Sequence, residues 1–164
     1  MKNQSKRIVM AAMFASLCCV ATMVIKIPSP LSGYINFGDV IVLLSGWLLS
    51  PVYAFCAAGI GSGLADVFSG YMLYAPVTFV IKGLMAIVCG YLYRKVGKKK
   101  NALISPIISA VIAELIMIGG YYVFEGFLYG FVPSVVNIPA NGVQGIAGIV
   151  AGTALLKVFK KVMI

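Results

Sequence analysis

The sequence predicts an all-α integral membrane protein with six transmembrane helices, the second of them short, and with both termini in the cytoplasm. Of its 164 residues, 62% are hydrophobic and only 10% are charged, too few charges to cover a soluble globule. Apolar runs near the roughly 20 residues of a membrane span recur along the chain. Apart from Lys26 and Lys82, all Lys and Arg cluster beside these runs, as in cytoplasmic loops. The whole chain, residues 1–164, is expected to form one membrane domain.

The first apolar run predicts a helix over residues 8–25, preceded by a basic stretch. The run is longer than the apolar core of a secretory signal, so we expect it to remain a membrane span. Ala11 and Ala15 lie one turn apart, a spacing of small side chains that lets another helix approach closely. Two interpretations remain open, internal packing and a docking face for a separate membrane subunit.

Residues 26–39 contain two prolines and two glycines and are predicted to form a loop. Its apolar side chains, among them Tyr34 and Phe37, suit a lid that folds over a cavity. They equally suit a plain connector that rests on the membrane interface.

Residues 40–68 form one kinked span or two short ones, divided at Ser50 and Pro51. Two helices, over residues 39–50 and 51–68, bring the total to six and place every basic cluster on one side of the membrane. The first is too short to cross about 30 Å of hydrocarbon at 1.5 Å per residue. We therefore expect its neighbours to shield it and a recess to open above it. Glycines at 59, 61 and 63 predict close helix packing, since no phosphate-loop Lys-Ser or Lys-Thr pair follows.

Residues 65–76 are a short polar and aromatic connection that contains Asp66, Tyr71 and Tyr74 and is soon followed by Lys82. Ionisable groups are costly to keep beside hydrocarbon. This stretch therefore indicates a small-molecule site near one membrane surface.

Three further helices are predicted over residues 75–93, 102–124 and 137–158, with an aromatic outer loop over residues 125–136. Lys82 and Glu114 lie within two of these helices at comparable depth. A salt bridge between them would satisfy both charges, and a ligand inserted between them is the functional alternative. Lys82 reaching to the membrane surface is a third interpretation.

The last predicted helix opens with Asn137, Asn141 and Gln144, spaced three and four apart and therefore on one face. Such amides suit hydrogen bonding to a heterocycle, although bonding between helices would also explain them.

Several function classes have little to support them. The chain has no histidine, four acids and no nucleophile motif, so we predict no enzyme, no metal site and no cofactor. Its net charge of +9 lies at helix ends without a nucleic-acid-binding motif, so nucleic acid is not an expected partner. A nucleotide site is also missing, so the chain cannot drive pumping by itself.

Several motifs together resemble one family, the substrate-binding S components of energy-coupling factor (ECF) vitamin transporters. They are Ala11-xxx-Ala15, residues 34–39, residues 61–66 and the stretch from residue 74 to 83. The likeness covers nearly the whole chain and is greatest to the riboflavin and hydroxymethylpyrimidine/pyridoxine branch. It implies capture of a vitamin from outside, between the first loop and helices four to six. It also implies a plasma-membrane location and docking, through the alanine face, onto a transmembrane T component that carries two ATPases. S components of this family are thought to topple within the membrane to deliver their cargo.

The function predicted from these observations is the substrate-specificity subunit of an ATP-driven importer, surrounded by membrane lipid, with pyridoxine or hydroxymethylpyrimidine as the first candidate ligand. Riboflavin is the alternative ligand, and a small membrane scaffold without a ligand is the alternative class. The predicted substrate-binding residues are Tyr34, Asn36, Tyr74, Phe79, Lys82, Glu114, Asn137, Asn141 and Gln144, and the predicted docking residues are Ala11 and Ala15.

Overall fold

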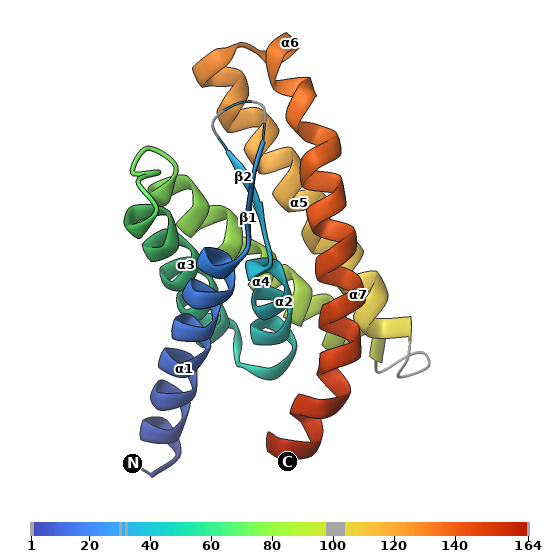
Figure 1. The fold of residues 1–164 in the computed structure, drawn as a ribbon. Coiled ribbons are helices and arrows are strands. Elements are labelled where there is room, and N and C mark those ends of the chain that lie inside the picture. The colour runs from blue at the N-terminus through green and yellow to red at the C-terminus, as the bar shows by residue number, and fades with distance from the viewer. Residues whose placement is uncertain (1, 30, 32, 98–103, 164) are drawn as a thin grey trace.

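Five long apolar helices and one short one make up the fold of the computed structural model, which describes residues 2–29, 31, 33–97 and 104–163. The long helices are α1 (Lys2–Val24), α3 (Pro51–Phe68), α4 (Ala75–Gly97), α5 (Ile104–Tyr129) and α7 (Ile138–Met163), and the short one is α2 (Gly38–Leu48). This confirms the predicted six-helix membrane fold. Both termini lie at the same end of the molecule (Figure 1). That this end faces the cytoplasm stays a prediction.

The region expected to be an outer loop is mostly helical. α5 continues to Tyr129, and a short helix α6 (Phe131–Ser134) and a 3-10 turn η1 (Val135–Asn137) lead directly into α7. The break falls at Gly130, whose φ of 94° suits glycine and reverses the chain. Across this break the aromatic side chains pack on each other, and the ring centroids of Phe127 and Phe131 lie 5.6 Å apart. The prediction of a loop over residues 125–136 was wrong, because these aromatic residues extend a helix as readily as they fill a loop.

The segment between α1 and α2 is a β-hairpin, which the prediction of a loop missed. β1 (Lys26–Pro28) pairs antiparallel with β2 (Tyr34–Asn36), and Ile27 lies opposite Ile35. β-Branched and aromatic residues favour this pairing. The hairpin stands between the α3 side of the molecule and α5 (Figure 1), above the N-terminal end of α2.

α2 is buried along almost its whole length, as predicted for a helix too short to span. Leu43 and Leu44 are fully buried in the core. Near the C-terminal end of α2, the Trp47 indole donates a hydrogen bond to Ser109 Oγ at 2.9 Å. Neighbouring helices therefore shield α2 from lipid, and the hairpin and the upper parts of the other helices surround the space above it.

Glycines bring the helices into close contact. A Cβ atom on Gly61 would lie 2.4 Å from the backbone oxygen of Ala15, so α1 and α3 meet backbone to backbone. A Cβ on Gly90 of α4 would lie 2.2 Å from the oxygen of Gly46 in α2. The contact at Gly61 agrees with the prediction that the glycines at 59, 61 and 63 allow close helix packing. Ala11 and Ala15 themselves are half-buried against the core, and their role in docking stays a prediction.

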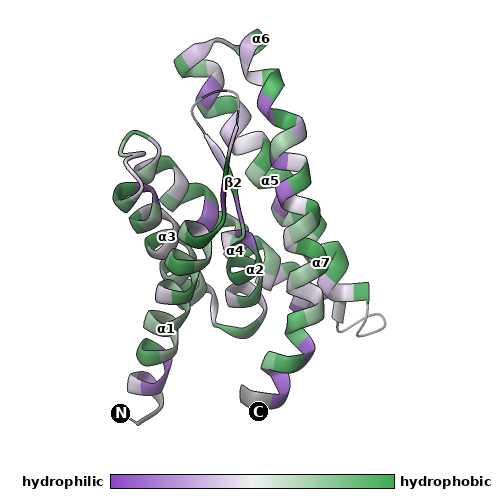
Figure 2. Cartoon of the chain, viewed as in Figure 1, coloured by the Kyte–Doolittle hydropathy of each residue, from purple (hydrophilic) through white to green (hydrophobic). Residues whose placement is uncertain are grey.

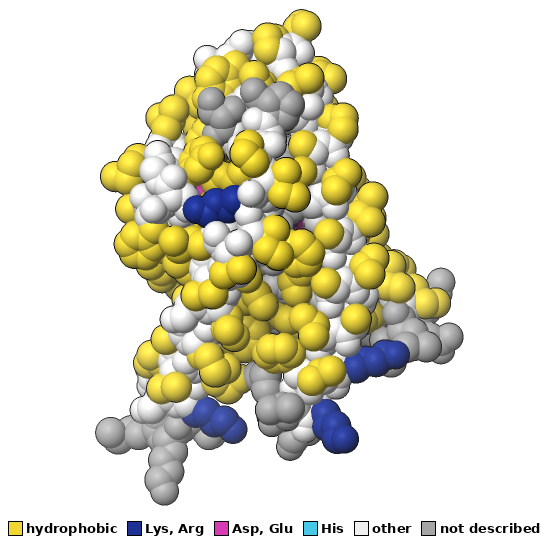
Figure 3. All heavy atoms as spheres, in the orientation of Figure 1, with side chains coloured by type: hydrophobic (Ala, Val, Ile, Leu, Met, Phe, Trp, Pro, Cys, Tyr) yellow, Lys and Arg dark blue, Asp and Glu magenta, His cyan; other side chains and the backbone are white. Residues whose placement is uncertain are grey.

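Charge is divided between the surface and the interior. Figure 2 shows hydrophobic residues along most of the length of the helices, and Figure 3 shows basic side chains at the end that carries both termini. All four acids of the chain are buried, each with no more than 4% of its surface exposed: Asp39, Asp66, Glu114 and Glu125. Because burying a carboxylate is costly, these four residues mark where the molecule concentrates its polar interactions.

Candidate functional site

A cavity lies between the hairpin and helices α1, α3, α4, α5 and α7. Of its lining residues, all but Gly33 carry a polar side-chain atom. They are Thr22, Ser29, Gly33, Tyr34, Asn36, Ser62, Asp66, Tyr71, Tyr74, Thr78, Lys82, Tyr121, Glu125, Asn141 and Gln144. The recess predicted above the short helix is therefore present, and polar side chains and tyrosine rings line it.

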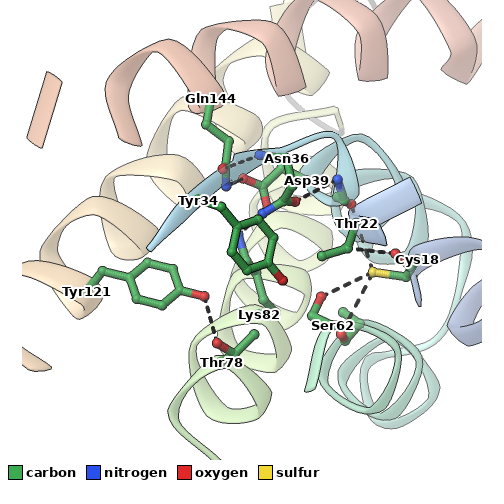
Figure 4. A network of polar contacts seen from close by, with 12 residues as sticks. Cys18, Thr22, Tyr34, Asn36, Asp39, Ser62, Thr78, Lys82, Tyr121 and Gln144 are labelled. Atoms are coloured by element: carbon green, nitrogen blue, oxygen red, sulfur yellow. Dashed lines mark hydrogen bonds and ion pairs between the residues drawn. The ribbon is translucent and has the colours of Figure 1, made fainter. Parts of the chain in front are cut away.

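The floor of the cavity is a network centred on Asp39, in the first turn of α2 (Figure 4). Lys82 of α4 forms a salt bridge with Asp39 Oδ1, and Gln144 of α7 donates to Asp39 Oδ2 at 2.5 Å. Gln144 Oε1 in turn accepts the backbone N–H of Asn36 at 2.8 Å. Both oxygens of the carboxylate are thus satisfied, as a buried charge requires. The network ties α2, α4, α7 and the base of the hairpin together.

The partner of Lys82 differs from the predicted one. Lys82 is 3% exposed, so it does not reach the surface, and it pairs with Asp39 instead of Glu114. The N-terminal turn of α2 favours a negative charge at Asp39. Both interpretations, surface exposure and a Lys82–Glu114 salt bridge, are therefore corrected.

Glu114 lies behind the network, against α7. A Cβ on Gly148 would lie 2.9 Å from Glu114 Oε1 and 3.1 Å from the Cβ of Asp39. Within the part of the chain that the structure describes, neither oxygen of Glu114 has a hydrogen-bond partner. Glu114 is not among the residues that line the cavity.

The hairpin closes onto α3 through two side chains. Tyr34 donates its hydroxyl hydrogen to Asp66 Oδ1 at 2.5 Å, and Lys26 bonds Ser69 just after α3. The ring of Tyr34 also packs on that of Tyr71, with centroids 4.7 Å apart. Burial and the nearby charge of Asp66 raise the pKa of Tyr34, so the phenol stays protonated and remains a donor.

A second carboxylate faces the cavity from α5. Glu125 Oε1 accepts a hydrogen bond from Asn137 Nδ2 at 2.9 Å and lies 3.4 Å from the hydroxyl of Tyr74. That hydroxyl also lies 3.1 Å from the backbone oxygen of Leu31, at the tip of the hairpin. Tyr74 therefore joins the hairpin to the upper end of α5.

The structure brings most of the predicted site residues to one place. Those that line the cavity are Tyr34, Asn36, Tyr74, Lys82, Asn141 and Gln144. Phe79 does not line it, because its ring packs edge-on against Phe55 at 5.3 Å, between α3 and α4. Glu114 lies behind it, and Asn137 contacts it only through Glu125. Whether any of these residues contacts a ligand stays a prediction.

The residue list drawn from the sequence missed several side chains. Asp66 and Tyr71 belong to the stretch that indicated a site, and their proximity to Tyr74 in the sequence was a usable signal. Thr78 and Tyr121, whose hydroxyls are 3.0 Å apart, gave no such signal. Asp39 and Glu125 stand at predicted helix ends, where an acid usually faces water.

Comparison with known proteins identifies the fold and the family. A model of the ECF-type riboflavin transporter S component family matches residues 2–161. A solved structure described as the S component of a bacterial ECF transporter superposes with a TM-score of 0.78 at 25% identity, covering 98% of both chains. The chain is 34% identical over 143 residues to an uncharacterised protein of the gap 3′ region in Pyrococcus woesei, covering 87% of this chain and 93% of the relative.

A more distant relative is the thiamine precursor transporter HmpT of Lactococcus lactis subsp. cremoris, 23% identical over 156 residues that cover 92% of this chain and 85% of the relative. S components are non-enzymatic binding subunits, and the chain is accordingly a multi-pass protein of the plasma membrane that binds a vitamin for an ECF importer. The match over nearly its full length places the chain in the ECF-type riboflavin transporter S component family.

Proposed function

We propose that this S component captures a small single-ring vitamin or vitamin precursor, a pyridine or a pyrimidine, in the cavity beneath the hairpin. The observation that carries the proposal is the lining itself. Among the described residues, no aliphatic or phenylalanine side chain lines the cavity. Amides, carboxylates and hydroxyls therefore surround the space, and a compact ring with several polar substituents can satisfy them.

Four tyrosines supply the aromatic faces of this site: Tyr34, Tyr71, Tyr74 and Tyr121. Tyrosine rings stack on a flat heterocycle, while their hydroxyls keep hydrogen-bond partners. Here the hydroxyls of Tyr34 and Tyr121 already bond Asp66 and Thr78, which fixes the two rings in place. We propose that the amides of Asn36, Asn141 and Gln144 form hydrogen bonds with the polar edge of the ring.

Riboflavin is the second candidate, because the matching family model is described by that vitamin. Its dimethyl-substituted edge is apolar and would have to pack on the tyrosine rings, because the other lining side chains are hydroxyls, amides and charged groups. The thiamine precursor named for the Lactococcus relative is a small polar ligand of the kind that this lining suits.

The hairpin serves as the lid in this proposal, and α1 as the coupling surface. Tyr34 and Lys26 hold the hairpin to the α3 end, so their release would open the cavity toward the end opposite the termini. The loaded protein then docks on a T component that carries two ATPases, through the face that contains Ala11 and Ala15.

The test is purification in mild detergent, followed by denaturation and mass spectrometry of any released small molecule. Calorimetric titration with pyridoxine, hydroxymethylpyrimidine and riboflavin completes it. A stoichiometric pyridine or pyrimidine supports the proposal, and riboflavin alone would replace it with the second candidate. Folded protein that retains and binds no vitamin in a wider panel would favour a scaffold without a ligand.

A further inference from the structure

Two hydrogen-bond acceptors next to the cavity have no donor among the described residues. They are Glu125 Oε2 and Asn137 Oδ1. Glu125 is 3% exposed and Asn137 is 2% exposed, so bulk water does not reach them freely. Buried acceptors without donors are uncommon in folded proteins and call for an explanation.

The orientation of the Asn137 amide follows from its partner. A carboxylate only accepts hydrogen bonds, so the atom of Asn137 that faces Glu125 Oε1 at 2.9 Å is the amide nitrogen. The carbonyl oxygen Oδ1 is therefore an acceptor that points elsewhere. Glu125 Oε1 is occupied by Asn137 and lies near the Tyr74 hydroxyl. The two atoms of this pair that still lack a partner, Glu125 Oε2 and Asn137 Oδ1, are both acceptors.

Glu125 lies where a bound molecule would touch it, and Asn137 lies behind it. Glu125 lines the cavity, and the hairpin passes over the pair at Gly33. A Cβ on Gly33 would lie 3.8 Å from Glu125 Oε1 and 3.9 Å from Asn137 Nδ2. The hairpin therefore lies directly against both side chains at Gly33.

The charges of the cavity also favour a donor. Of the acids that line it, Asp66 accepts from Tyr34 and Glu125 from Asn137, and neither forms a salt bridge among the described residues. Lys82, the lysine that lines the cavity, is paired with Asp39. The lining therefore presents two acids without a cationic partner among the described residues, which a cationic or N–H-bearing ligand complements.

We propose that Glu125 Oε2 binds an amino group of the cargo, so that the ligand is an amino-substituted pyrimidine or pyridine. The inference rests on the proposed function, because it assumes that a single-ring vitamin occupies this cavity. Asn137 holds the carboxyl group of Glu125 from behind through Nδ2. An oxygen acceptor in place of the amino group would face Oε2 with no hydrogen between them. Such a site discriminates strongly against ligands that leave its polar groups unpaired.

The experiment compares ligand pairs that differ only at the amino group. Pyridoxamine against pyridoxine and 4-amino-5-hydroxymethyl-2-methylpyrimidine against its 4-oxo analogue are titrated by calorimetry into the detergent-purified chain. For at least one pair, we expect the amino form to bind at least tenfold more tightly. Glu125→Gln places a donor where the acceptor was and should reduce that ratio at least tenfold. Tyr91→Phe, at an exposed position on α4 outside the lining, is the control and should leave the ratio unchanged.

The outcomes separate the two levels of the proposal. Equal binding of amino and oxygen forms by the wild-type chain overturns the amino-group inference and leaves the binding function intact. An unchanged ratio in folded Glu125→Gln has the same consequence. Thermal unfolding shows whether that variant folds. If it does not, the ratio in the wild-type chain decides alone. Absence of binding to any ring in the panel, from folded protein, overturns the proposed function itself.

Discussion

Tyr34 in the hairpin and Asp66 in α3 are joined by a hydrogen bond of 2.5 Å between the phenol hydroxyl and Oδ1. The two residues are distant in sequence and come from the lid and the wall of the same cavity. Asp66 is 4% exposed, so without this donor a buried carboxylate would lose a partner. The contact therefore links closure of the hairpin to the satisfaction of a charge.

Tyr34→Phe should weaken ligand binding by about 1–3 kcal/mol, the usual cost of removing a hydrogen bond to a charged group and leaving it unpartnered. Ring packing against Tyr71 is retained in this variant, so the loss reports the hydroxyl. Calorimetric titration with the identified ligand measures it. Tyr91→Phe, an exposed position on α4, is the control and should bind as the wild type does. Unchanged affinity in Tyr34→Phe would show that the lid closes without this bond.

The stability of the fold should decrease at alkaline pH. Burial first, and then the charge of Asp66, raise the pKa of Tyr34 above the ordinary tyrosine value of about 10. Because the pKa is higher in the folded state, this contribution to stability is fully present below about pH 10 and is lost as the pH rises beyond it. We expect the free energy of unfolding of the wild-type chain, followed by thermal unfolding, to fall above about pH 10. The fall should be smaller in Tyr34→Phe, which shares all other titrating groups, and parallel profiles would contradict the assignment.

Lys82→Met should destabilise the fold by about 3–5 kcal/mol, because it leaves Asp39 charged and buried without its cation. The double variant Lys82→Met/Asp39→Asn removes that charge and keeps a partner for Gln144, so it should recover much of the loss. Thermal unfolding in detergent measures both. Lys157→Met, at an exposed position on α7, should behave as the wild type. A double variant no more stable than the single one would argue against the pairing.

Glu114→Met should leave stability unchanged or raise it by about 1 kcal/mol, since the carboxyl oxygens have no partner among the described residues. Methionine has a similar length and needs no hydrogen bond at this depth. Thermal unfolding of the ligand-free protein is the measurement. A clear loss of stability would mean that Glu114 is held by a partner, as the original expectation of a Lys82–Glu114 salt bridge required.

Ala15→Leu should bind the vitamin and lose ATP-driven uptake, because a larger side chain blocks close approach of a partner helix. Vitamin uptake into cells that express the complete transporter, compared with binding by the purified variant, separates the two effects. Val150→Leu, on the exposed face of α7, is the control for bulk added at the surface. Retained uptake in Ala15→Leu would exclude this face of α1 as the coupling surface.

Much of the site was within reach of the sequence. Tyr34, Tyr74, Lys82 and Gln144 were predicted from polar residues beside long apolar runs, and all four line the cavity. Phe79 was not placed correctly, because an aromatic residue on a helix gives no sign of which neighbour it packs against. In the fold it meets Phe55.

The sequence by itself determined the number of spans, the short α2 and the clustering of basic residues at helix ends. Transfer of a residue from water to lipid depends mainly on that residue, so run lengths and flanking charges suffice to predict membrane helices. The tertiary structure alone decided that residues 26–28 pair with residues 34–36 as a hairpin and that Lys82 meets Asp39 instead of Glu114. A buried charge takes the partner that helix crossing brings within hydrogen-bonding distance, and that geometry depends on the packing of the whole bundle.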